Sequence, residues 1–263
     1  MDLWDRVVPL LPARPTRRHR YPGRLPVDDR SALTGIVYVL CRGVSWRDVP
    51  AEQVGCSGEA AWRRLREWTE AGVWPRLHEV LLAELRAAGL LEHGRRGDRR
   101  IARACPQRGT HTGPSPVDRA RPGSKHHLIV DRQGTPLAVS LTSGNRPDVT
   151  QLVPLLDAVP RIRGLRGRPR RQPRRLFADG GYDYDEYRRL VRARGITPKI
   201  ARRGVPHGSG LGKTTRWVVE RTFAWLHQFK QLRIRYEMRA DLHLGLLQFT
   251  FSMICLRRLR TSF

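Results

Sequence analysis

Two acidic residues stand where the chain could carry out chemistry. Asp179 ends the apolar run 176–178 and is followed by two glycines. A strand presents an acid in this way at its carboxyl end, where open α/β sheets keep their sites. Glu220 lies inside an apolar helical pattern over 217–226, and an acid there needs a partner or a cation because an unpaired buried charge is costly. In a very basic chain, two such carboxylates indicate metal-assisted chemistry on a polyanion.

Each acid also has an ordinary structural interpretation. An aspartate that follows a strand often caps the next helix, which we expect of Asp183. Glu220 could form an ion pair with Arg216, one helical turn before it. Asp131 follows an expected strand and is more typical of a hairpin turn than of a metal ligand. The residues alone leave these alternatives open.

Arginine dominates the composition of the chain. Of 263 residues, 50 are Lys or Arg and 24 are Asp or Glu, which gives a net charge of +26. Such an excess concerns partners rather than fold and points to nucleic acid or an anionic membrane surface. A GC-rich genome would also favour arginine, so we give this signal less weight. No pair among the four cysteines has CxxC spacing, which argues against a zinc site and a disulfide framework.

The chain shows no targeting or membrane-spanning pattern. Its start lacks a basic segment followed by a long apolar core, so we expect no signal peptide. The most apolar stretch, 242–256, is shorter than a bilayer span and contains His243 and Gln248. We therefore expect a cytoplasmic, nucleoid-associated protein without a membrane partner.

The first third of the chain divides into an arm, a helical domain and a linker. Residues 1–27 are rich in Pro and Arg and predict an extended, mobile basic arm. Residues 28–90 predict a small all-α domain whose short helices resemble a helix-turn-helix DNA-binding arrangement. Asp28 is expected to cap its first helix, Gly43 to end that helix, and Ser57 to cap the third. Residues 91–124 show no convincing period and predict a linker and an active-site loop.

From residue 125 the pattern changes to an α/β domain that extends to 263. A strand pair joined by a turn comes first, and strands then alternate with helices. This order predicts a mixed sheet with helices on its faces. The expected strands are 127–131, 136–142, 175–179 and 196–201, and the expected helices are 148–159, 183–194, 215–229 and 240–258.

Several arginines are candidates for contacts with DNA phosphates. The third helix of the all-α domain carries Arg63, Arg64 and Arg66, and the loop 168–175 is similarly basic. An ordinary solvated helix face is the alternative for the helical arginines. If they bind phosphates, DNA affinity should fall steeply as salt is raised.

Residues 28–260 resemble the bacterial insertion-sequence DDE transposases of the four/five group. The matching motifs span nearly the whole chain and are specific. They are GIVYVL at 35–40, WRDVP at 46–50, TGPSPVD at 112–118, GSKHH at 123–127, SGNR at 143–146, ADGGYD at 178–183 and RWVVERTFAWL at 216–226.

This resemblance implies a fold and an activity. The fold would be α/β, an RNase H-like mixed sheet flanked by helices and preceded by a small all-α, helix-turn-helix-like domain. Three carboxylates would hold two Mg²⁺ ions, for which Mn²⁺ can substitute, with Asp179 as the second acid and Glu220 as the third. The enzyme would cut at the ends of its element and join the freed 3′-hydroxyl to target DNA. Its partners would be double-stranded DNA, as terminal inverted repeats and as target, and further copies of itself on DNA.

The resemblance also implies basic contacts to DNA near the acids. The family has a basic residue four positions before its third acid, where Arg216 stands here. Lys125, His227 and Lys230 complete the basic residues expected at the DNA. The chain departs from the family pattern twice, with Lys213 in place of a tyrosine and His227 in place of a lysine.

The first acid of the family is the main departure. The family shows a strand ending in Asp-Gly-Ser-His about a dozen residues before the TGPSP loop, and this chain lacks that motif. Asp98 lies near the corresponding position, fourteen residues before Thr112, within an Arg/Gly/Cys/Pro-rich patch over 96–106. The patch looks like a short out-of-frame segment. The alternative function is therefore a DNA-binding remnant that does not cut. A nuclease acting on RNA hybrids would share the fold, but it has little use for the helical domain.

Overall fold

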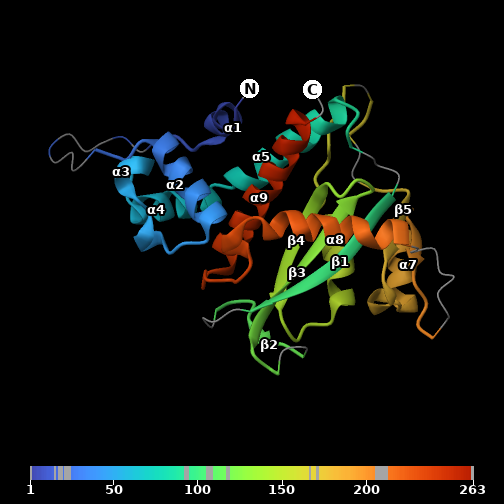
Figure 1. The fold of residues 1–263 in the computed structure, drawn as a ribbon. Helices are drawn as coiled ribbons and strands as arrows, with labels where there is room; N and C mark the ends of the chain where they lie inside the picture. The colour runs from blue at the N-terminus through green and yellow to red at the C-terminus, as the bar shows by residue number, and fades with distance from the viewer. Residues whose placement is uncertain are drawn as a thin grey trace.

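The chain folds into a helical part and a mixed sheet that share one core (Figure 1). The computed structural model describes residues 2–14, 16, 20, 25–91, 95–104, 109–116, 119–165, 167–169, 172–204 and 213–261. For 95–104 and 213–217 the description covers the backbone alone.

The helices of the helical part are α1 (Leu3–Val7), α2 (Asp29–Arg42), α3 (Ala51–Val54), α4 (Gly58–Glu70) and α5 (Val73–Ala87). Of these, α2 begins and ends and α4 begins at the residues that the sequence predicts. Asp28 caps α2 by accepting a hydrogen bond from the Ser31 N–H at 2.9 Å. Gly43 ends α2 with a φ of 67°, a conformation that glycine adopts readily. Ser57 caps α4 in the same way as Asp28 caps α2.

The predicted basic arm is partly wrong, because residues 3–7 form the helix α1. Asp2 and Asp5 form a capping box at its start, and Val7 is fully buried. Arg6 donates to Glu84 of α5 at 2.7 Å, which ties α1 to the helical part. A five-residue helix surrounded by Pro and Arg gives too short an apolar pattern to be recognised from sequence.

The sheet contains both antiparallel and parallel strand pairs. Its strands are β1 (Arg95–Ala104), β2 (Gly113–Pro114), β3 (Pro122–Asp131), β4 (Pro136–Ser143), β5 (Arg175–Ala178) and β6 (Thr197–Ile200). β3 lies between β4 and β1, and β5 lies between β1 and β6. β1 runs antiparallel to β3 and parallel to β5, which in turn runs parallel to β6. The predicted mixed sheet is confirmed.

The strand β1 corrects the prediction of a linker over 91–124. Residues 95–104 pair with β3 on one side and with β5 on the other, in the middle of the sheet. β3 also starts earlier than predicted, at Pro122. The arginines and glycine of β1 give no alternating pattern, so this strand depends on its two neighbours rather than on local preference.

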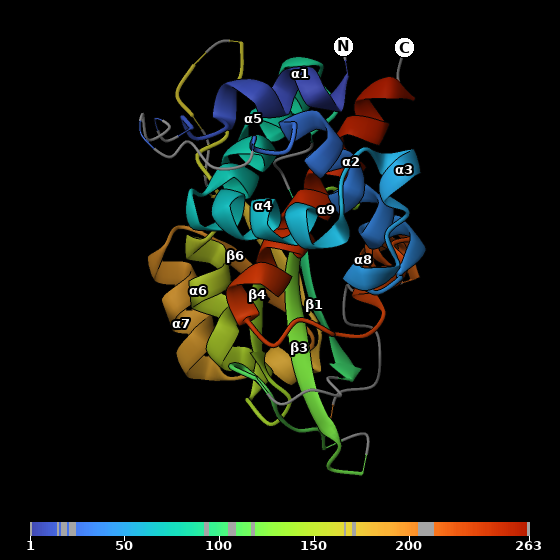
Figure 2. The same cartoon turned by 90° about the vertical axis from the view of Figure 1, so that its left-hand side faces the viewer.

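Helices cover both faces of the sheet (Figure 2). α6 (Leu152–Asp157) and α7 (Asp185–Ala193) lie on one face, and α8 (Lys213–His227) lies on the other. α8 contacts β1 and β3. The last helix, α9 (Ala240–Arg260), packs against α5 and β4 and so joins the helical part to the sheet. Among the described residues, no helix is long and apolar enough to span a bilayer.

Candidate active site

The carboxyl end of β5 presents Asp179 to solvent. The strand residues 176–178 are buried, whereas Asp179 is exposed. Its Oδ1 accepts a hydrogen bond from the Gly181 N–H at 2.8 Å and so caps the short 3-10 helix Gly180–Tyr182. This bond orients the carboxylate while the second oxygen remains available to a ligand at the surface.

The backbone register brings Asp98 next to this strand end. Asp98 of β1 is paired with Ala178, the last residue of β5, and on the other side with Ile129 of β3. The position of its carboxylate lies outside the described side chains. Because adjacent strands lie about 4.8 Å apart, the register alone places the backbones of Asp98 and Asp179 in one neighbourhood.

Glu220 lies on the solvent side of α8. Its neighbours Val218, Val219 and Phe223 are buried, but Glu220 is exposed, so the helical pattern does not bury this acid. The Thr222 hydroxyl donates to the Gly134 carbonyl at 2.7 Å and fixes α8 at the turn between β3 and β4. That turn follows the end of β3 that pairs with the start of β1.

The three acids offer only carboxylate oxygens, which Mg²⁺ and Mn²⁺ prefer. The donor chemistry therefore fits the ions that the resemblance implies. Within the described side chains, which exclude that of Asp98, no group of three or more His, Cys, Asp and Glu residues could hold a metal ion.

A cluster around Asp183, which the sequence did not reveal, supports the turn after β5. Asp183 was expected to cap a helix, but it accepts hydrogen bonds from Arg188 at 2.6 Å and from the Arg203 N–H at 2.9 Å. The hydrogen bond from the Arg203 N–H contributes most to holding the pKa of Asp183 below its usual value. The hydrogen bond and charge of Arg188 lower this pKa further. The Arg188 side chain is buried, so this pair fixes α7 and the segment after β6 to the turn that follows Asp179.

Family comparisons identify the chain. A family described as "Transposase DDE domain" matches residues 98–254, and the match begins at Asp98. A second, "Putative transposase of IS4/5 family (DUF4096)", matches residues 2–78. The chain belongs to the DDE transposase family, in its IS4/5 group.

Two relatives of this transposase come from Burkholderia cepacia. The "Putative transposase for insertion sequence element IS402" is 60% identical over 151 residues, which cover 57% of this chain and 71% of that protein. The "Insertion element IS402 uncharacterized 16.2 kDa protein" is 58% identical over 95 residues, 36% of this chain and 64% of that protein. A solved structure, the Mos1 mariner paired end complex with Mn, is 14% identical with a TM-score of 0.29 and covers 93% of this chain and 82% of that chain. The family assignment rests on the sequence matches.

The three arginines of α4 that are predicted to contact DNA differ in their environment. Arg63 is exposed. Arg66 lies over the Trp62 ring, 5.6 Å from its centroid. Arg64 forms ion pairs with Asp29 at 3.2 Å and with Glu67 at 2.5 Å. Its charge is therefore used within the helical part, which leaves Arg63 and Arg66 as the candidates on α4.

Lys125, predicted at the DNA, is instead a structural residue. It is only 4% exposed, and its Nζ donates to the Arg146 carbonyl at 2.7 Å and to Asp148 at 3.2 Å. A buried, paired ammonium cannot reach a phosphate, so this prediction is withdrawn. Lys230 is exposed and His227 is partly buried at the end of α8. The side chain of Arg216 lies outside the described residues.

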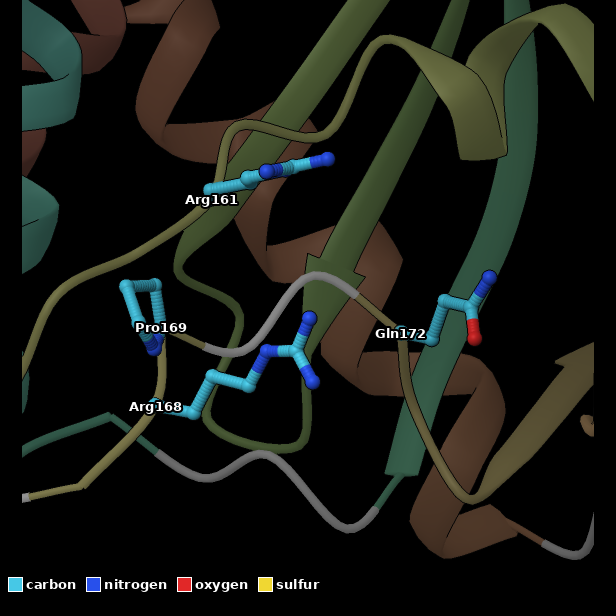
Figure 3. Close-up of a pocket in the computed structure, with 4 residues that line it drawn as sticks. All are labelled: Arg161, Arg168, Pro169 and Gln172. Atoms are coloured by element: carbon cyan, nitrogen blue, oxygen red, sulfur yellow. The ribbon is translucent and has the colours of Figure 1, made fainter.

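A basic pocket lies in the loop between α6 and β5, at the other end of β5 from Asp179. It has a volume of about 400 Å³ and is lined by Arg161, Arg168, Pro169 and Gln172. Figure 3 shows both arginine side chains extending into the space that Gln172 borders on the opposite side. The guanidinium groups make this pocket suited to anions rather than to neutral ligands.

Proposed function

We propose that this transposase cuts DNA at the ends of its insertion sequence and joins the freed 3′-hydroxyl to target DNA. Asp98, Asp179 and Glu220 would hold two Mg²⁺ ions for this chemistry. The observation that supports the proposal most directly is the pairing of Asp98 with Ala178, which brings the first acid to the strand that carries the second. The family match that starts at Asp98 agrees with this assignment.

The chemistry needs carboxylates rather than a protein nucleophile. Cleavage and strand transfer are in-line displacements at phosphorus, by water and then by the DNA 3′-hydroxyl. When bound, two metal ions about 3.5–4 Å apart activate the incoming oxygen and stabilise the leaving one. The chain's own part is to hold the ligands: the Gly181 N–H orients Asp179, and the Thr222 bond to Gly134 fixes the helix of Glu220.

The same proposal names the partners. Double-stranded DNA would contact Arg63 and Arg66 of α4 and the Arg161–Arg168 pocket through its phosphates. Two element ends have to be joined to one target, so we propose at least a dimer on DNA. A steep loss of affinity between low and high salt would be expected of such phosphate contacts.

The test is DNA cleavage by the purified full chain. Duplex DNA carrying the ends of the flanking element, incubated with Mg²⁺ or Mn²⁺, should be nicked to leave 3′-hydroxyl ends. Asp179→Asn and Glu220→Gln should abolish nicking, and Asp98→Asn should do the same if β1 supplies the first acid. Asp157→Asn, at the exposed end of α6, is the matched control and should cut normally.

Two outcomes would contradict the proposal. Nicking that persists in Asp179→Asn would exclude this acid from the chemistry. Specific binding of the element ends with no nicking by the unchanged chain would favour the DNA-binding remnant. That outcome would agree with the absence of the Asp-Gly-Ser-His motif at Asp98.

A further inference from the structure

Arg203 follows the carboxyl end of β6, and its side chain reaches the turn that follows β5. We propose that Arg203 binds a phosphate of the DNA backbone beside Asp179. This inference rests on the proposed function, because it assigns a substrate contact to the same site. Arg203 belongs to none of the motifs that carry the family resemblance, and the sequence alone did not single it out.

The sheet places Arg203 next to the turn that follows Asp179. β5 and β6 are parallel, and Ala178 is paired with Ile200. The pairing continues one step beyond the strands, because the Ala201 N–H donates to the Ala178 carbonyl at 3.1 Å. The segments that follow β5 and β6 therefore leave the sheet side by side, at the edge where α/β sheets bind their ligands.

The guanidinium of Arg203 is held over this turn by several contacts. Its Nε donates to the Gly180 carbonyl at 2.8 Å, and its Nη2 lies 3.4 Å from the Gly181 carbonyl. The ring of Tyr184 stacks against it, with the centroid 4.8 Å from Cζ. These contacts hold a long side chain in one orientation, which reduces the entropy lost when it binds a ligand.

Arg203 keeps a donor and its full charge for a ligand. The side chain is exposed, and its Nη1 has no acceptor among the described residues. Nor does any described carboxylate form an ion pair with this guanidinium. Asp183 accepts from the Arg203 backbone N–H but directs its charge at the buried guanidinium of Arg188.

A phosphate is the ligand that this arrangement fits. The planar fork of arginine matches phosphate oxygens. An ion pair between Arg203 and a phosphate would also neutralise negative charge of the DNA backbone, which the nearby carboxylates repel. The backbone of Asp179 is one residue from the carbonyl that holds Nε. A phosphate bound by Arg203 would thus lie beside the acid proposed to hold the metal ions, at or next to the bond that is cut.

The first test measures DNA binding without metal, so that it does not depend on cleavage. Affinity of the full chain for duplex DNA carrying the element ends is measured in EDTA over a range of salt concentrations. Loss of one phosphate contact in Arg203→Gln should reduce the slope of log affinity against log salt by about 0.9. Arg203→Lys keeps the charge and should retain most of the slope. Arg192→Gln removes the same charge from the exposed side of α7 and should leave the slope unchanged.

The second test measures cleavage by the same variants. Arg203→Gln should cut roughly 10²-fold more slowly than the unchanged chain, as expected when a donor to a reacting oxyanion is lost. Arg203→Lys should fall between them because it keeps the charge without the fork. Equal slopes in EDTA for Arg203→Gln and Arg192→Gln would overturn the inference, and thermal unfolding would show whether Arg203 only supports the turn. If the unchanged chain does not cut, the proposed function fails, whereas the slope in EDTA still decides whether Arg203 contacts DNA.

Discussion

Arginine side chains have different roles in two regions of the molecule. One region is the seam, where Arg235 and its neighbours join the helical part to the sheet. The other is the open end of β5, where Arg203 lies. At the seam, Arg235 is fully buried and every one of its nitrogens donates to protein oxygens. At the end of β5, Arg203 also donates to backbone carbonyls, but it is exposed. Both arginines hold a loop in place. The difference is burial, which commits the charge of Arg235 to the fold and leaves that of Arg203 for a ligand.

Arg235 clamps the loop that precedes β2. It donates to the Thr110 carbonyl at 2.8 Å and to the Ser124 hydroxyl at 2.6 Å, which in turn donates to the His111 carbonyl. Gly109 is required on this loop, because a Cβ there would lie 2.3 Å from the Met238 carbonyl oxygen. The clamp therefore fixes the TGPSP segment to the chain that leads into α9.

Other polar groups cross the same seam. The Trp46 indole N–H donates to Glu237 at 2.9 Å, and His78 of α5 bonds the Pro136 carbonyl of β4 at 2.9 Å. His126 of β3 and His243 of α9 are buried with their Nε2 atoms 2.9 Å apart. A buried polar group without its partner is costly, so these contacts specify how the two parts of the chain dock.

The largest effect should come from removing the clamp. Arg235→Met leaves several buried oxygens without a donor and should lower the free energy of unfolding by about 3 kcal/mol or more. Arg203→Gln, at the open end of β5, should change it by less than about 1 kcal/mol. Urea unfolding at neutral pH measures both. Similar losses in the two variants would mean that burial does not separate the roles of these arginines.

A pH dependence should follow from His78. Burial lowers the pKa of His78 to about 4 from the usual 6.5, although the bond to the Pro136 carbonyl opposes this. Between these values the unfolded chain takes up a proton that the folded chain does not. The free energy of unfolding should therefore fall as pH falls, by about 2 kcal/mol between pH 7 and pH 5.

The His78→Gln variant isolates this contribution. Glutamine can still donate to the Pro136 carbonyl but does not titrate. The difference between the pH profiles of the unchanged chain and of His78→Gln measures the effect of His78 alone. Two parallel profiles would show that His78 is protonated equally in the folded and unfolded states. That result would contradict a buried, neutral His78.

A smaller effect is expected where one hydrogen bond crosses the seam. Trp46→Phe keeps an aromatic ring but removes the donor to Glu237, and it should lower the free energy of unfolding by about 1–2 kcal/mol. Trp62→Phe is the control, because the indole N–H of Trp62 bonds no described residue. Chemical denaturation of both variants would test the comparison, and equal losses would remove Glu237 from the set of seam contacts.

Local signals predicted much of the fold. The helix starts at Asp28 and Ser57 and the stop at Gly43 are confirmed, because caps act within one helical turn. Asp131 makes the hairpin turn as predicted, with its Oδ1 accepting from the N–H groups of Gln133 and Thr135. β1 was missed because its residues carry no alternation and gain their partners from β3 and β5, far along the chain.

The basic residues were harder to assign from sequence. Arg63 and Arg64 are adjacent in the chain, yet one is exposed and the other is paired with two acids. Lys125 lies in a family motif but is buried against Asp148. A pattern of charges cannot separate such cases, because burial and pairing depend on residues brought from elsewhere.

The sequence by itself determined the family, the acids proposed for catalysis and the local starts and stops of most helices. All of these depend on residue types at short spacing. Only the tertiary structure decided which charges are buried and paired, which stay exposed, and how β1 brings Asp98 to β5. The physical reason is that burial and pairing arise between distant segments, as in the bond between Trp46 and Glu237, whose positions differ by 191 residues.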